Sequence, residues 1–194
     1  MLTAALLLTT AMAADLPKGR HMEIATVNTW GLPAPLAPRR AERFNALEQW
    51  LSDESYDIVG LQEVWRGARH LLTRATMHLP SLDSGDSGLA LWTRHPVSRL
   101  KVHSYSTARW PDSWKAKGVL NATVAHPTLG AIEVWVTHLQ AGRSHRAAAV
   151  RQQQVSELLD IAVSTRQGLL LGDFNLYDEQ PDDVESAQRL TEAG

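Results

Sequence analysis

Hydrophobic and polar positions along this chain follow two alternating patterns. Short apolar runs at 22–28, 58–61 and 168–172 have the length and the β-branched or leucine-rich composition of buried strands. Between them, apolar residues spaced three and four apart predict amphipathic helices over 39–55 and 143–165. Strand, helix and strand therefore succeed one another, which indicates α/β layering.

The middle of the chain is predicted to be mostly sheet, after a helix over 66–78. Segments rich in β-branched and aromatic residues occupy 87–97, 98–106, 118–126 and 131–138. The last two are separated by Pro-Thr-Leu-Gly, which is typical of a hairpin turn. The pattern shows no internal repeat and no low-complexity block.

Composition narrows the class of protein. The 194 residues are 44% hydrophobic and 21% charged, which fits one globular domain. With a formal net charge of −2, the chain has no broad basic field to hold nucleic acid or an anionic membrane by charge alone. Cysteine is absent, which excludes disulfides, thiolate zinc sites and a cysteine nucleophile.

The N-terminus has features of a secretory signal. An apolar run from Leu2 to Met12 overlaps Ala-Met-Ala, a small-x-small pattern typical of a signal-peptidase site. We expect residues 1–14 to be a signal peptide, residues 22–194 to form the domain, and the protein to be secreted or periplasmic. Because no Lys or Arg precedes the run, a disordered start is the alternative.

Four predicted strands end in a chemically useful polar residue. These are Asn28, Glu63, His138 and Asp173, with Asn175 two positions further on. Each alone has a structural explanation, such as a turn cap, but ligands of layered α/β proteins bind beyond the carboxyl ends of strands. Glutamate and asparagine oxygens suit Mg²⁺ or Mn²⁺, and the other groups suit a phosphoryl group and its attacking water. The joint pattern predicts metal-assisted phosphodiester hydrolysis.

Several motifs, in this order, resemble the endonuclease/exonuclease/phosphatase superfamily, and most closely its neutral sphingomyelinases. They are NTWGLP (28–33), DIVGLQEVW (57–65), SGLALWTRHPV (87–97), KGVLNATV (117–124), VTHLQA (136–141) and GDFN (172–175). The resemblance spans about 22–178. It implies an α/β (α+β) fold, a four-layered αββα sandwich in which two sheets pack face to face between outer helices.

The resemblance also implies a role for each site residue. Glu63 and Asn28 match the metal site, and His138 matches the histidine that contacts phosphate oxygens. Asp173 matches the aspartate that positions the attacking water, and Asn175 the asparagine that stabilises the charged phosphoryl group. The implied enzyme is a Mg²⁺- or Mn²⁺-dependent phosphodiesterase that releases phosphocholine from a sphingolipid.

Two further features bear on substrate binding. Lys117 and Gly118 match a lysine-glycine stretch of sphingomyelinases that would touch substrate phosphate, although Lys117 has the alternative of a solvated residue before a strand. Trp110 and Trp114 would supply contacts to a membrane surface. The alternative for a tryptophan is packing in the core, which is favoured for Trp92 and Trp135 because they lie on predicted strands.

The expected partner is a phospholipid or another phosphodiester, with nucleic acid less favoured and no protein partner implied. Two other functions stay open. One is a nuclease or sugar-phosphate phosphatase of the same superfamily, which would share the catalytic residues. The other is a non-catalytic module that binds phosphate or lipid through the same metal site.

The resemblance stops before the closing Asp-His pair of the superfamily, whose histidine is the usual base. No histidine follows His145, and the last residues predict only carboxylates and a short helix. We therefore expect a domain incomplete at its C-terminus, with an uncovered sheet edge, poor solubility and little turnover. A divergent short form is the alternative.

Overall fold

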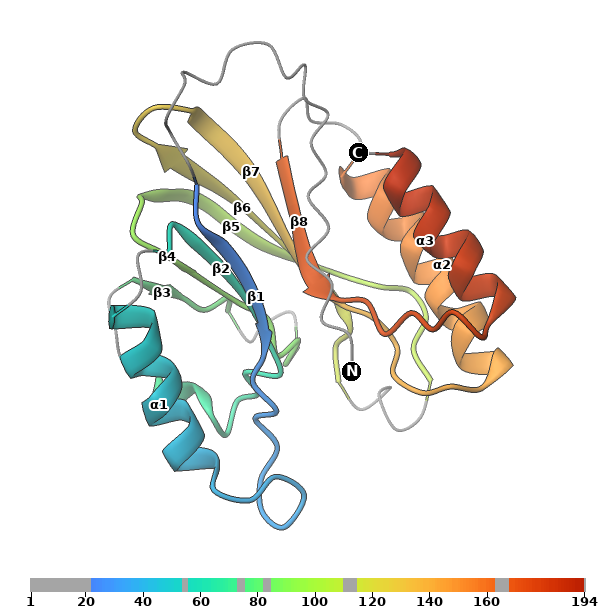
Figure 1. The fold of residues 1–194 in the computed structure, drawn as a ribbon, viewed down its shortest axis with the longest axis horizontal. Coiled ribbons are helices and arrows are strands. Elements are labelled where there is room, and N and C mark those ends of the chain that lie inside the picture. Colours follow the sequence, from blue (N-terminus) through green and yellow to red (C-terminus); the bar gives the residue numbers. More distant parts are fainter. Residues whose placement is uncertain are drawn as a thin grey trace.

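Two sheets packed face to face, with helices on both outer faces, form a four-layered sandwich (Figure 1). This computed structural model describes residues 22–53, 56–72, 76–81, 85–109, 115–162 and 168–193. The αββα sandwich predicted from the sequence is confirmed. The predicted signal peptide and the Trp110 and Trp114 pair lie outside the described residues, so those expectations stay predictions.

The first sheet has the strand order β1-β2-β4-β3. Its strands are β1 (Ile24–Asn28), β2 (Ile58–Gln62), β3 (Met77–His78) and β4 (Ala90–Thr93). β1 and β2 are parallel because α1 (Arg40–Asp53) forms the crossover between them. The other two pairings are antiparallel.

The second sheet has the order β5-β6-β7-β8. Its strands are β5 (Val97–Ser104), β6 (Gly118–His126), β7 (Gly130–His138) and β8 (Gly168–Asp173). The predicted hairpin joins β6 to β7 in antiparallel register. β7 and β8 are parallel, with α2 (His145–Ala162) as their crossover. α3 (Pro181–Glu192), the predicted C-terminal helix, packs beside α2 (Figure 1).

Three apolar clusters hold the layers together. One cluster lies between α1 and the first sheet and contains Trp92. Another lies between the second sheet and the helices α2 and α3 and contains Trp135. Both tryptophans are therefore core residues, as the sequence favoured. The cluster between the sheets is aliphatic and includes Ile58, Leu120 and Leu171. Both β2 and β7 are therefore buried on two faces, which explains their unbroken apolar runs.

The prediction of a helix over 66–78 is wrong. In that range the described residues form only a 3-10 turn, η1 (Arg69–Leu71), and then β3. The N–H of Val64 donates to the carbonyl of Gly88 at 2.8 Å, and the N–H of Arg66 donates to the carboxylate of Asp86. These long-range hydrogen bonds tie the segment to a distant loop and override its local helical spacing. Among the described helices, none has the length and apolar character needed to cross a bilayer.

Candidate functional site

The carboxyl ends of four strands meet at one edge of the sandwich. Asn28 ends β1, Glu63 directly follows β2, and the parallel register places Asn28 opposite Gln62. His138 and Asp173 end β7 and β8 and are paired in register. Because β1 packs against β8 across the two sheets, both pairs of strand ends arrive at the same place. The predicted convergence is therefore a property of the fold.

The Asn28 carboxamide connects the two sheets at this edge. Its Nδ2 donates one hydrogen bond to Glu63 Oε1 and another to Asp173 Oδ2, each at 2.9 Å. Its Oδ1 accepts a hydrogen bond from the N–H of Trp30 at 3.0 Å, which fixes the orientation of the amide. One side chain thus holds two carboxylates that come from different sheets and are 110 residues apart in the chain.

The backbone of Glu63 is held in an uncommon conformation. Its φ of 61° lies in the left-handed region, which costs a non-glycine residue roughly 1 to 3 kcal/mol. The preceding carbonyl, that of Gln62, accepts hydrogen bonds from the N–H and the hydroxyl of Thr29, both at 2.9 Å. A Cβ on Gly31 would lie 2.1 Å from the Glu63 carbonyl oxygen, so only glycine permits this close packing. These contacts turn the side chain of Glu63 toward Asn28.

His138 lies beside Asp173, with 3.9 Å between its Nε2 and Asp173 Oδ2. The side chain is 4% exposed, and its Nδ1 is buried without a hydrogen-bond partner. Burial, with a smaller contribution from the positive charge of Lys117, holds the pKa of His138 well below its ordinary value of 6.5. The imidazole is therefore neutral at physiological pH and suited to donating one hydrogen bond.

This neutral histidine predicts that the fold loses stability in mild acid. The unfolded chain binds a proton at His138 near pH 6.5 and the folded chain does not. Stability is therefore highest above pH 6.5 and falls as the pH drops below it, by at most about 1.4 kcal/mol per pH unit from this group. We expect urea unfolding between pH 7.5 and 5.5 to show a smaller loss in a His138→Gln variant.

The control for this prediction is already within the chain. Burial also lowers the pKa values of His78 and His103, and both residues are unchanged in the variant. The difference in slope between the two proteins therefore reports His138. Equal slopes for the two proteins would show that His138 takes up its proton in the folded state.

Asn175 is positioned by the carbonyl of Leu139, which follows β7. Asn175 Nδ2 donates to this carbonyl at 3.2 Å, and Lys117 Nζ donates to it at 3.0 Å. The N–H of Asn175 donates to Asp173 Oδ1 at 3.2 Å, and its φ is 51°, again in the left-handed region. Lys117 is 3% exposed. It is therefore a buried cation at the site and not the solvated residue that was its alternative.

Gly118 has a different place from the other predicted residues. It begins β6, and a Cβ there would lie 2.2 Å from the carbonyl oxygen of His103 on β5. Its own carbonyl accepts a hydrogen bond from the Thr137 hydroxyl at 3.0 Å. Close strand packing accounts for this glycine, and its contact with a substrate stays a prediction. The structure thus brings together the side chains of the six other predicted residues: Asn28, Glu63, Lys117, His138, Asp173 and Asn175.

Two contributors to the site have no clear signal in the sequence. One is the Leu139 carbonyl, a backbone group that no residue type reveals. The other is Tyr177, whose hydroxyl donates to Asn175 Oδ1 at 3.5 Å. Tyr177 lies two residues after Asn175 in the sequence, which places it near the site, but the direction of its hydroxyl depends on how α3 packs. The N–H of Tyr177 donates to Asp183 of that helix at 3.2 Å.

The donor set at this edge fits a hard divalent cation. Carboxylate and carboxamide oxygens are ligands that Mg²⁺ and Mn²⁺ prefer. The two carboxylates already face each other, whereas the Asn28 amide presents its Nδ2 to them and would have to rotate for its Oδ1 to join the set. Glu63 and Asp173 accept hydrogen bonds from the same nitrogen, so their two negative charges lie close together and repel each other. A bound cation would neutralise this repulsion. Glu63 and Asn28 would hold such an ion, with Asp173 beside it.

Comparison with known proteins places this geometry in a family. The sequence profile described as Endonuclease/Exonuclease/phosphatase family matches residues 25–189. Human "Sphingomyelin phosphodiesterase 2" is 29% identical over 178 residues, which cover 82% of this chain and 42% of the human protein. "Inositol phosphosphingolipids phospholipase C" of Schizosaccharomyces pombe is 29% identical over 181 residues, with 82% and 42% covered. The chain thus spans under half the length of these curated relatives.

Solved structures share the fold at lower sequence identity. Sphingomyelinase C from Streptomyces griseocarneus superposes with a TM-score of 0.67 at 20% identity, over 88% of this chain and 69% of that one. A variant of beta toxin from Staphylococcus aureus with bound magnesium ions gives a TM-score of 0.73 at 17% identity, over 86% and 68%. At these identities the likeness establishes the shared four-layered architecture.

Proposed function

We propose that this chain, which belongs to the endonuclease/exonuclease/phosphatase family, is a metal-dependent phosphodiester hydrolase of the sphingomyelinase type. One observation carries the proposal: the Asn28 amide binds Glu63 and Asp173 at once, at the meeting point of two sheets. Ligands of layered α/β proteins bind beyond the carboxyl ends of strands, which is where this amide and its two carboxylates lie. The sphingolipid phosphodiesterases among its relatives support the choice of substrate class.

Glu63 and Asn28 are proposed to hold Mg²⁺ or Mn²⁺. The ion would supply positive charge to a phosphodiester oxygen and lower the cost of the charge that develops on the leaving oxygen. The left-handed backbone of Glu63 places its side chain at this edge before the ion arrives, and the Asn28 amide would rotate to turn its oxygen toward the ion.

The remaining residues act on the phosphoryl group and on water. The Asp173 carboxylate accepts a hydrogen bond from the attacking water and orients it for in-line displacement. The neutral imidazole of His138 donates a hydrogen bond to a phosphoryl oxygen and keeps its proton while doing so. Asn175 donates to the same group, and the Lys117 ammonium adds positive potential from beneath the site. Phosphocholine is the proposed headgroup released.

The test is release of phosphocholine from sphingomyelin vesicles under single-turnover conditions, with protein in excess and Mg²⁺ present. We expect Mg²⁺-dependent release that a chelator stops. Nicking of supercoiled DNA without phosphocholine release would select the nuclease alternative. Mg²⁺-dependent vesicle binding without any hydrolysis would select the non-catalytic module.

The loop after β1 is proposed to contact the lipid surface. Trp30 is 46% exposed and Leu36 is 64% exposed, and Trp30 donates its N–H to Asn28 at the site. Exposed aromatic and aliphatic side chains favour the interfacial region of a bilayer. Membrane contact at Trp30 would present a lipid headgroup directly to Asn28 and Glu63.

A double Trp30→Ala, Leu36→Ala variant tests this contact. We expect its rate on sphingomyelin vesicles to fall by about tenfold, because the variant loses two apolar side chains that would insert into the lipid surface. Its rate on a water-soluble phosphodiester should be unchanged. Val184→Ala is the matched control, since Val184 is an exposed apolar residue on α3. Equal losses on both substrates would rule out a membrane role for the loop.

A further inference from the structure

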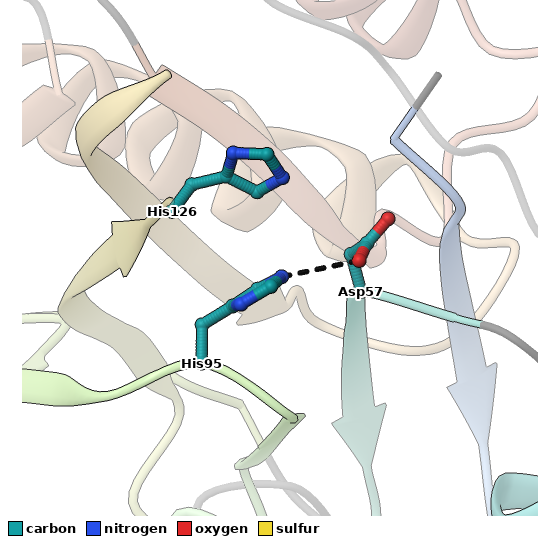
Figure 2. Close-up of side chains that lie close together, drawn as sticks. All are labelled: Asp57, His95 and His126. Atoms are coloured by element: carbon teal, nitrogen blue, oxygen red, sulfur yellow. Dashed lines mark hydrogen bonds and ion pairs between the residues drawn. The ribbon is translucent and has the colours of Figure 1, made fainter. Parts of the chain in front are cut away.

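A second group of metal-ligating side chains lies at the opposite end of β2 from Glu63. Asp57 directly precedes β2, His95 lies between β4 and β5, and His126 ends β6. One ligand atom from each residue lies within 4.8 Å of the other two (Figure 2). The five residues of β2 lie between Asp57 and Glu63, which puts the two about 20 Å apart, so this group is distinct from the phosphodiester site.

The three side chains face one another across the gap between the sheets. His95 Nε2 lies 3.1 Å from Asp57 Oδ1, and the rings of His95 and His126 meet edge to face with centroids 4.7 Å apart. Figure 2 shows both imidazoles and the carboxylate pointing toward a common centre. All three side chains are half-buried. The ligand atoms thus come from both sheets and are partly shielded from water.

Two of the three residues are pre-positioned by the surrounding backbone. Asp57 Oδ2 accepts a hydrogen bond from the N–H of Glu23 at 2.9 Å, which leaves Oδ1 directed at His95. The Thr93 hydroxyl donates to the carbonyl of Asp57 at 2.7 Å and accepts from the N–H of His95 at 3.1 Å. One threonine therefore fixes both ligand-bearing segments relative to each other.

His126 lies in a turn whose groups contact its Nδ1. The backbone N–H groups of Thr128 and Leu129 donate to Nδ1 at 3.3 and 3.2 Å, and the Thr128 hydroxyl lies 3.2 Å from it. Nδ1 is therefore an acceptor in the metal-free chain, and the ring proton is on Nε2. A metal bound through Nε2 would displace this proton; Nδ1 would then carry a proton and donate it to the Thr128 hydroxyl, with the two N–H groups turned away.

We propose that Asp57, His95 and His126 form a binding site for a divalent transition metal of the zinc class. Two imidazoles and one carboxylate are a zinc-type ligand set, whereas Mg²⁺ prefers oxygen ligands alone. Ligand atoms of a four-coordinate zinc are about 3.3 Å apart, close to the distance between Asp57 and His95. The ion would tie the first sheet to the second, with water as its fourth ligand.

The positive charge of Arg94 sets the strength of this site. Arg94 Nε lies 3.9 Å from Asp57 Oδ1 and donates to the carbonyl of Tyr56 at 2.6 Å. Its side chain is 41% exposed, so it swings into solvent when a metal takes the carboxylate oxygen. Removing this charge should therefore strengthen metal binding.

The test uses Co²⁺ as the probe, because four-coordinate Co²⁺ absorbs visible light strongly. The tag-free chain carries Glu63→Gln so that the phosphodiester site takes up no ion. We expect one Co²⁺ per chain, displaced by Zn²⁺ and not by Mg²⁺. His95→Gln or His126→Gln in this background should weaken binding about 100-fold. His145→Gln is the matched control, because His145 is an exposed histidine at the start of α2.

Two further measurements keep the proposal falsifiable if a ligand variant unfolds. Thr128→Val retains all three ligands and should weaken binding about tenfold through loss of the Nδ1 contact. Zn²⁺, and not Mg²⁺, should raise the thermal midpoint of the Glu63→Gln chain. The proposal is overturned if the chain binds no Co²⁺, if the histidine variants bind it as tightly as the parent, or if Mg²⁺ displaces it. Any of these results leaves Asp57 and His95 as an ion pair.

Discussion

Replacing Glu63 by glutamine is expected to lower the rate of Mg²⁺-dependent phosphodiester hydrolysis by about 1,000-fold. The loss follows from weaker binding of the ion, which supplies several kcal/mol of stabilisation to the charged transition state. Glutamine keeps the shape and the hydrogen-bond acceptor that Asn28 uses, so the fold should be unchanged. Initial rates of phosphocholine release, measured over a range of Mg²⁺ concentrations that includes those that only part-saturate the parent chain, measure the effect.

The matched control for Glu63→Gln is Glu42→Gln. Glu42 is an exposed glutamate in the first turn of α1 and contacts none of the site residues described above. Its replacement should leave the rate within about twofold, since an exposed charge far from a site is screened by solvent. A Glu63→Gln variant that kept its rate and its Mg²⁺ dependence would exclude this carboxylate as a metal ligand.

The largest expected loss of stability follows from Asp183→Ala. Asp183 on α3 accepts two hydrogen bonds from the guanidinium of Arg151 on α2, at 2.8 and 2.5 Å, and both side chains are fully buried. Removing the carboxylate leaves a buried cation without its partner, which costs about 3 to 5 kcal/mol. For a chain of this size the thermal midpoint should fall by roughly 10 °C. Differential scanning calorimetry measures this shift.

Two variants separate the cause of that loss. Arg151→Met with Asp183→Leu removes both charges and should recover much of the midpoint, because a packed apolar pair replaces a buried ion pair at little cost. Glu179→Ala breaks the exposed pair between Arg143 and Glu179 and should change the midpoint little. If the double variant were as unstable as Asp183→Ala, lost volume and not the unpaired charge would be responsible.

The Asp183 variant should also disturb the site, because α3 supports it. Arg151 donates to the carbonyls of Gln140 and Gly142, which follow β7, and Asp183 accepts from the N–H of Tyr177. Tyr177 in turn donates to Asn175. A buried ion pair thus connects the outer helices to the loops that carry the phosphoryl-binding groups.

Strand ends were the most predictable part of the structure. β2 and β8 are buried on both faces, so their apolar runs were unbroken and their last polar residues marked where each strand stops. Parallel pairing then follows from the intervening helices, which places Asn28 beside Glu63 and His138 beside Asp173. The resemblance to a known family added the face-to-face packing that brings the two pairs together.

Contacts that depend on tertiary packing were beyond prediction. The segment over 66–78 has helical spacing, yet hydrogen bonds to the loop around Asp86 tie down its start, and its described residues form turns, a 3-10 helix and the short strand β3. Lys117 had no apolar context in the sequence to indicate burial, and its carbonyl partner belongs to a different strand end. Asp57, His95 and His126 are separated by more than 30 residues each, and no local pattern links them.

The central claim is that Asn28, Glu63 and Asp173 form one pocket for a divalent cation. A crystal of the chain grown with Mn²⁺ tests it most directly, through the anomalous scattering of the ion. We predict an anomalous peak in contact with the Glu63 carboxylate and the Asn28 carboxamide oxygen, with Asp173 beside it. A map without a peak at this position, or a structure in which Glu63 and Asp173 lie on separate faces, would contradict the account.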